Sequence, residues 1–257
     1  MSCSRSRPPA ILDQDCTLQL PCDEGAFQND KPIKTPMLEE MKSWQSAQAA
    51  SVSSFGLAVL ASSIFGRCVR YVYGKRGAEV VPPWDPKSDY VANNASLLLL
   101  ESLIDLRQAS ASDTALQESP EAGHRTFSWI LFHLSHRLLN HPFLMRLRLR
   151  TVAARTPASF VAHALHLSRT HATQLTDLLT SAATGPAHLE SSFYSYCAAV
   201  AAGIHSLAHA VGQQAVYSDE AGSYMEKAMQ ALRRLAGPWP FAVRMVGQLY
   251  LLTSPDE

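Results

Sequence analysis

Histidines are the side chains whose number and spacing could most readily support chemistry in this chain. Seven of the ten lie in one block, residues 124–171. His205 and His209 are four residues apart, a spacing that can hold zinc when a third ligand arrives from elsewhere. No Asp or Glu lies within the His205 turn, and the HExxH pattern is absent. We therefore expect satisfied or solvent-facing histidines and assign no metal ligand. Two further pairs, three apart, are His133–His136 and His163–His166.

The cysteines form neither a metal-binding nor a disulfide pattern. No Cys-x-x-Cys occurs, so a zinc ribbon, finger or cluster cannot be assembled from this chain. An odd count with irregular spacing favours a reducing compartment over a disulfide framework. Cys197 lies in an apolar segment, which predicts a small core residue and not a nucleophile. The five cysteines are Cys3, Cys16, Cys22, Cys68 and Cys197.

A basic block could bind phosphate. Between His124 and Thr176 there is no acidic residue but several arginines. The acidic side chains near the N-terminus are an equally good partner for this block, and a net charge of zero gives nucleic-acid binding no support. We therefore assign no DNA-binding residue. The arginines are Arg125, Arg137, Arg146, Arg148, Arg150, Arg155 and Arg169, and the acidic residues are Asp13, Asp15, Asp23 and Glu24.

Enzyme signatures are missing from the sequence. It contains no glycine-rich dinucleotide or phosphate loop, no GxSxG turn and no helix motif with paired carboxylates. We predict that the chain is not an enzyme. We accordingly assign no catalytic residue, no cofactor-binding residue and no cofactor.

The elements that must position these side chains are helices. The composition, 47% hydrophobic and 17% charged, is that of a globular protein. Apolar residues recur at helical spacing, and no stretch shows sustained period-two alternation. We predict an all-α, irregular multi-helix domain of roughly seven to nine helices. The longest apolar stretches, near 55–65 and 239–252, are interrupted and fall short of a membrane span, so no membrane partner is expected.

One helix is expected at the centre of the domain. Its apolar stripe runs from Phe127 to Leu138, and Pro142 should end it near Asn140. A second should end at Gly74, and a third should be capped by Asp85 or Ser88. Others are predicted over about 157–184, 189–211, 220–235 and 241–252.

The domain boundaries follow from composition. Residues 1–36 contain five prolines and are predicted to form an extended arm that packs on a single helical regulatory domain, residues 37–257. A Ser/Ala/Glu-rich flexible loop is expected at about 108–123. The expected anchors of the arm are Ile11, Leu12, Leu18, Leu20 and Phe27.

Several segments together resemble a known family. The run from Asp15 to Glu24, followed by Phe27, resembles the opening of the fungal-specific transcription factor domain. This is the middle homology region of fungal two-zinc, six-cysteine cluster transcription factors. The order and spacing of the other family-like segments fit over nearly the whole chain. They are Gly66-Arg67 with Val69 and Tyr71, Pro83-Trp84-Asp85 with Ser88, and Leu138-Leu139-Asn140-His141-Pro142-Phe143.

The resemblance implies a nuclear regulator of RNA polymerase II transcription, such as that of a metabolic gene cluster. In this family, the zinc ions and the DNA contacts belong to an N-terminal zinc-cluster module. The residues of this chain do not have the cysteine pattern of such a module. The expected alternatives are a fragment or truncated gene model, and a stand-alone regulatory domain. Candidate partners are a second copy of the chain, a component of the transcription machinery and a small-molecule effector.

Two other interpretations of the sequence stay open. One is a helical small-molecule-binding protein or enzyme whose pocket lies among the histidines of the 124–171 block. The other is a scaffold that only dimerises, through the Ala-rich segment near Tyr194.

Overall fold

The computed structural model describes residues 13–42, 52–74, 81–109, 120–184, 191–212 and 218–253. Within these ranges the chain forms nine α-helices and three short 3-10 helices, labelled η. No strand occurs in the described ranges, where the only β pairing is an isolated bridge between Gln19 and Met37. The predicted all-α fold class is confirmed.

The contacts within the chain define two compact units. Unit 1 contains residues 1–139 and 148–153, and unit 2 contains residues 140–147 and 154–257. The sequence predicted one domain over residues 37–257, and that boundary stays a prediction. Each unit is therefore described by itself.

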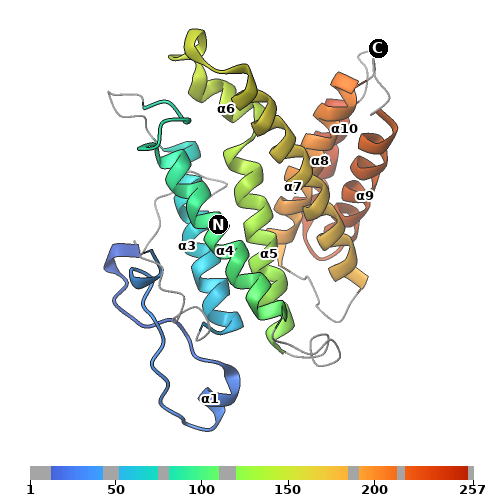
Figure 1. The fold of residues 1–257 in the computed structure, drawn as a ribbon. Coiled ribbons are helices and arrows are strands. Elements are labelled where there is room, and N and C mark those ends of the chain that lie inside the picture. Colours follow the sequence, from blue (N-terminus) through green and yellow to red (C-terminus); the bar gives the residue numbers. More distant parts are fainter. Residues whose placement is uncertain are drawn as a thin grey trace. The chain divides into compact units, whose positions relative to one another are not determined.

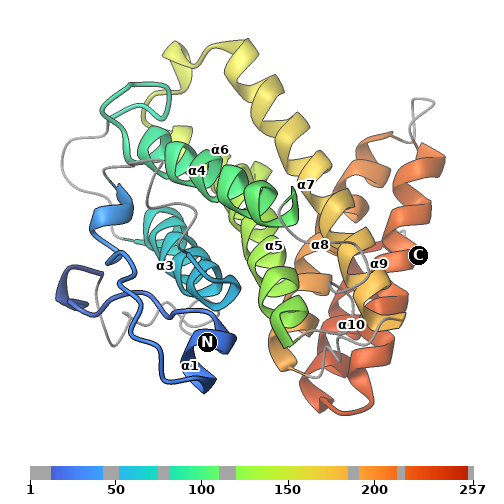
Figure 2. The ribbon, with the colours of Figure 1, turned by 60° about the horizontal axis from the view of Figure 1, so that its bottom comes forward.

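Unit 1 is built on three helices that lie side by side in Figures 1 and 2: α3 (Ser54–Tyr73), α4 (Asp89–Ala109) and α5 (Pro120–Leu139). α3 packs most extensively against α5. Ser53 caps α3, because its hydroxyl accepts a hydrogen bond from the Gly56 amide at 2.9 Å. The helix ends at Gly74 as predicted, where a Cβ would lie 2.3 Å from the Arg70 carbonyl oxygen.

The predicted caps and breaks of α4 and α5 are largely reproduced. Ser88, one of the two expected caps, accepts from the Val91 amide at 3.2 Å and donates to the Pro83 carbonyl at 2.8 Å. α5 ends one residue before Asn140, as Pro142 requires. The loop predicted at about 108–123 is helical at both ends: α4 continues to Ala109, and α5 begins at Pro120, a residue that suits the first turn of a helix. Its residues 110–119 lie outside the described ranges.

The described part of the N-terminal arm contains η1 (Asp13–Asp15) and α1 (Glu24–Gln28), and η2 (Glu40–Lys42) follows the arm. Leu20 is 3% exposed and is an anchor as predicted. Leu18 and Phe27 are each 74% exposed, so their prediction as anchors is wrong. Polar contacts also hold the arm: Thr35 donates to the Leu20 carbonyl, and Ser53 donates to the Pro21 carbonyl at 2.7 Å. Ile11 and Leu12 lie outside the described residues.

Unit 2 contains α7 (Ala158–Thr184), α8 (Ser192–Gly212), α9 (Ser218–Ala236) and α10 (Pro240–Thr253), close to the four predicted segments. α8 packs most extensively against α9 and also contacts α7 and α10. Small side chains fill this contact, which lets the helix backbones approach closely. The buried ones are Cys197, Ala198, Ala201 and Ala202. Two elements lie between α5 and α7: α6 (Pro142–Leu149), which spans both units, and η3 (Ala153–Arg155).

Among the described residues, α3 is the one helix long and apolar enough to cross a membrane by length and composition. Of its apolar window, 44% is buried inside the protein, where Leu57, Leu60 and Ile64 are almost fully enclosed. Core helices pass the same test of length and composition. The burial favours a core helix over a membrane span.

Candidate functional site

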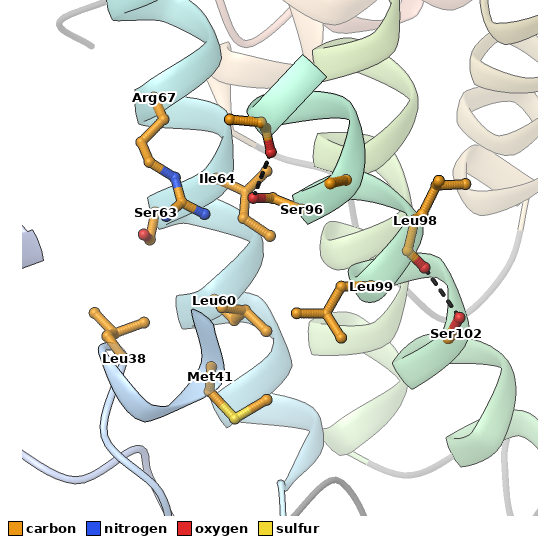
Figure 3. Close-up of a pocket in the computed structure, with 12 residues that line it drawn as sticks. Leu38, Met41, Leu60, Ser63, Ile64, Arg67, Ser96, Leu98, Leu99 and Ser102 are labelled. Atoms are coloured by element: carbon orange, nitrogen blue, oxygen red, sulfur yellow. Dashed lines mark hydrogen bonds between the residues drawn. The ribbon is translucent and has the colours of Figure 1, made fainter. Parts of the chain in front are cut away.

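A cavity of about 480 Å³ lies between α3 and α4 in unit 1. This volume is within the range of about 300–1,000 Å³ that is typical of small-molecule sites. We call it the α3–α4 cavity, and Figure 3 shows its lining. The segment around η2 contributes Leu38 and Met41, α3 contributes Leu60, Ser63, Ile64 and Arg67, and α4 contributes Ala92, Ala95, Ser96, Leu98, Leu99 and Ser102.

One end of the α3–α4 cavity is apolar. Figure 3 shows Leu38, Met41, Leu60 and Leu99 gathered there. Met41 and Leu60 are each 3% exposed, so this end is part of the core surface of unit 1. An aliphatic group placed there would lose its contact with water, which is favourable at about 25 cal/mol per Å² of apolar surface.

The other end carries the guanidinium of Arg67. Figure 3 shows this side chain extending along α3 toward Ser63. Ser63 Oγ donates to Asp13 Oδ2 at 2.8 Å, and Arg67 Nη1 lies 4.0 Å from the same oxygen. Arg67 Nε is buried and has no hydrogen-bond partner among the described residues. A charged donor at this end can therefore take a further acceptor.

The hydroxyl protons of the two α4 serines are already used. Ser96 donates to the Ala92 carbonyl and Ser102 to the Leu98 carbonyl, each at 3.0 Å, as the dashed lines in Figure 3 show. Charge recognition in the α3–α4 cavity consequently depends on Arg67.

A second cavity of about 320 Å³ adjoins the first, since both are lined by Arg67, Ala92 and Ser96. It is more polar and lies beside Tyr71, whose ring carries Arg148 at 3.9 Å from Cζ to the ring centroid. Such a contact contributes about 0.5–1 kcal/mol. The rest of its lining is Arg70, Tyr71, Asp89 and Asn93.

Two histidines of the predicted pairs, His133 and His205, make packing contacts, whereas His163 and His166 are exposed. His133 stacks on Trp129 with ring centroids 5.4 Å apart. The ring of His205 stacks on Tyr224 with centroids 5.5 Å apart, and its Nε2 lies 3.1 Å from Thr176 Oγ1. Within the described residues, no group of three His, Cys, Asp or Glu side chains could hold a metal ion. Neither of the two cavities is lined by histidine.

The other predicted residues fall outside the α3–α4 cavity. Cys197 is fully buried, as expected, and burial raises the pKa of the Cys68 thiol to about 12. The basic block is divided between the two units, so we describe no single phosphate patch. The described ion pair of the acidic arm joins Asp13 to Arg67, which is not part of that block.

Sequence reasoning did not find the α3–α4 cavity. The sequence singled out Arg67 only as part of the family-like segment Gly66-Arg67. The available signal was the set of small and hydroxyl side chains on α4, at Ala92, Ala95, Ser96 and Ser102, which leaves room beside α3. Comparison of the chain with protein-family models, with curated proteins and with solved structures found no match.

Proposed function

We propose that this chain is the regulatory domain of a fungal zinc-cluster-type transcription factor, and that it acts in the nucleus on RNA polymerase II transcription. The proposal starts from the ordered family-like segments of the sequence. DNA contact would belong to a zinc-cluster module elsewhere in such a regulator. In this proposal the domain controls activity through a partner or a small effector.

One observation carries the proposal furthest: the family-like segment Gly66-Arg67 supplies the charged end of the α3–α4 cavity, where Arg67 lies. Another family-like residue, Ser88, does not line the cavity but caps α4, the helix that forms the opposite wall. A regulatory domain needs a site where binding can change how its elements pack, and this cavity joins two helices and the segment around η2.

The physical mode of control is a shift between two arrangements of unit 1. A ligand in the α3–α4 cavity would contact both helices at once and would favour the arrangement that binds it better. Its effect on transcription is limited by the difference in its affinity for the two arrangements.

A reporter assay tests the proposal. The chain is fused to a heterologous DNA-binding domain, and transcription is compared with that of the DNA-binding domain alone. We expect transcription to change with the fusion, and to change further when the cavity is filled by Ala95→Phe. Ala162→Phe, at an exposed position on α7 in unit 2, is the matched control and should behave like the wild-type fusion. Equal transcription from the fusion and from the DNA-binding domain alone, under every inducer tested, would refute the proposal.

The alternative of a binding protein or enzyme with a His-rich pocket stays a prediction. No observation on the two cavities favours it, because histidine lines neither of them. Metal analysis and a thermal-shift screen with metabolites separate the alternatives, since stoichiometric metal or turnover would favour the His-rich pocket.

A further inference from the structure

We infer that the α3–α4 cavity takes an amphipathic carboxylate, an acid with an aliphatic body, whose carboxylate competes with Asp13 for Arg67 and so releases η1 of the N-terminal arm from α3. This inference rests on the proposed function, because it names the effector class and the regulation of the same cavity. Its first test is binding to the purified chain, which does not depend on transcription.

The shape of the α3–α4 cavity sets the body of the ligand. The guanidinium of Arg67 lies beside Ser63, which is about one helical turn from Leu60 on α3, or about 5 Å along the axis. The apolar end around Leu60 and Met41 offers no charged group, whereas the far end is built on the guanidinium. A molecule that fills both ends therefore has an aliphatic body and a polar head at one end of it.

The charge of that head is set by Arg67. Its Nε is buried without a hydrogen-bond partner among the described residues, and its Nη1 reaches Asp13 only at 4.0 Å. A carboxylate can accept from two guanidinium N–H groups at once, which is the strong, fork-like geometry of this pair. An ammonium head would instead be repelled by the guanidinium, and a hydroxyl head would gain no charge-assisted bond.

Asp13 does not line the α3–α4 cavity, but it already pairs with the guanidinium that a ligand carboxylate would bind. Its Oδ2 accepts from Ser63 at 2.8 Å and faces Arg67, and its side chain is only 16% exposed. Asp13 begins η1, the first described element of the arm. A ligand carboxylate and the Asp13 carboxylate would both need the same guanidinium, so binding competes with the docking of η1. The arm further along stays held by the contact of Ser53 with Pro21.

Isothermal titration of the intact chain with decanoate and with 1-decanol tests the ligand class. We expect decanoate to bind at least about tenfold more tightly than 1-decanol, which has the same body without the charge. Arg67→Gln should weaken decanoate binding at least about tenfold and leave 1-decanol binding unchanged. Arg234→Gln, the same charge change at an exposed site in unit 2, should leave both unchanged.

Asp13→Asn tests the competition and keeps the inference falsifiable if Arg67→Gln does not fold. A neutral amide competes less for the guanidinium, so we expect decanoate to bind about three- to tenfold more tightly to this variant. Hydrogen exchange of the amides of residues 13–16 should speed up when decanoate saturates the wild-type chain. It should already be fast in Asp13→Asn without ligand, while exchange in α9 should not change.

Three results would overturn the inference: absence of decanoate binding to the folded chain, equal affinity for decanoate and 1-decanol, or looser decanoate binding in Asp13→Asn. If the reporter fusion responds while decanoate does not bind, the regulatory proposal stands and the ligand class is wrong. If decanoate binds as expected while the fusion is inert, the cavity is a binding site and the regulatory proposal is wrong.

Discussion

His171 should make the folding stability of unit 2 sensitive to acid. The imidazole lies on α7 and is 8% exposed. Burial deprives the charged ring of solvating water and, with a smaller contribution from His166, lowers the pKa of His171 from 6.5 to about 4. The folded chain therefore keeps this ring neutral at pH values where the unfolded chain takes up a proton.

The direction and size of the effect follow from that difference. Because the folded pKa is the lower one, the unfolded state binds more protons, and stability falls as the pH is lowered from 6.5 to about 4. Each pKa unit corresponds to about 1.4 kcal/mol. The loss is therefore about 3 kcal/mol in total, and about 2 kcal/mol of it falls between pH 7 and pH 5.

Urea unfolding at pH 7 and pH 5 measures this contribution. Between these pH values, the free energy of unfolding of the wild type should fall by about 2 kcal/mol more than that of His171→Leu, whose side chain cannot bind a proton. His163→Leu removes an exposed imidazole from the same helix, and its free energy of unfolding should fall as much as that of the wild type. Equal losses in wild type and His171→Leu would show that burial of this ring is not linked to acid sensitivity.

Three further predictions concern unit 1. Leu100→Ala removes a side chain that is 0% exposed and should lower the free energy of unfolding in urea by about 2–5 kcal/mol. Leu98→Ala, at a 60% exposed position on the same helix, should lower it by less than about 1 kcal/mol. Ser53→Ala removes the cap of α3 and should lower the free energy of unfolding, measured by thermal unfolding, by about 1–2 kcal/mol. Ser102→Ala, in the middle of α4, should leave it nearly unchanged. Equal effects of the two substitutions would contradict the capping role. Burial raises the pKa of Cys68 to about 12, and the thiolate is the reactive form of a cysteine. N-ethylmaleimide at pH 7.5 should therefore label Cys68 only at the rate of unfolding. Rapid labelling detected by peptide mass spectrometry would contradict this.

The helices could be predicted because their signals are local. Apolar periodicity placed α3, α5 and α7 to α10, and residues such as Gly74, Pro142 and Pro157 marked their ends. The arm has no such period, so hydrophobicity alone did not reveal that Leu20 is buried while Leu18 and Phe27 are exposed. α6 begins at Pro142 and is eight residues long, which is too short for a periodic signal.

The α3–α4 cavity could not be predicted because it depends on contacts between distant parts of the chain. Asp13 and Ser63 are 50 residues apart, and nothing in either local pattern indicates that they meet. The residues next to Arg67 in the sequence do not indicate that it lies beside a cavity. Its role at the end of a cavity depends on the way α4 packs on α3, which a single sequence does not encode in any short motif.

The two units are interleaved along the chain, and this has a consequence for synthesis on the ribosome. Residues 140–147 belong to unit 2, but residues 148–153 return to unit 1, where Arg148 lies over Tyr71. Nascent unit 1 thus cannot complete its contacts when α5 leaves the exit tunnel. It must wait for the peptide that follows, by which time the first residues of unit 2 have already emerged.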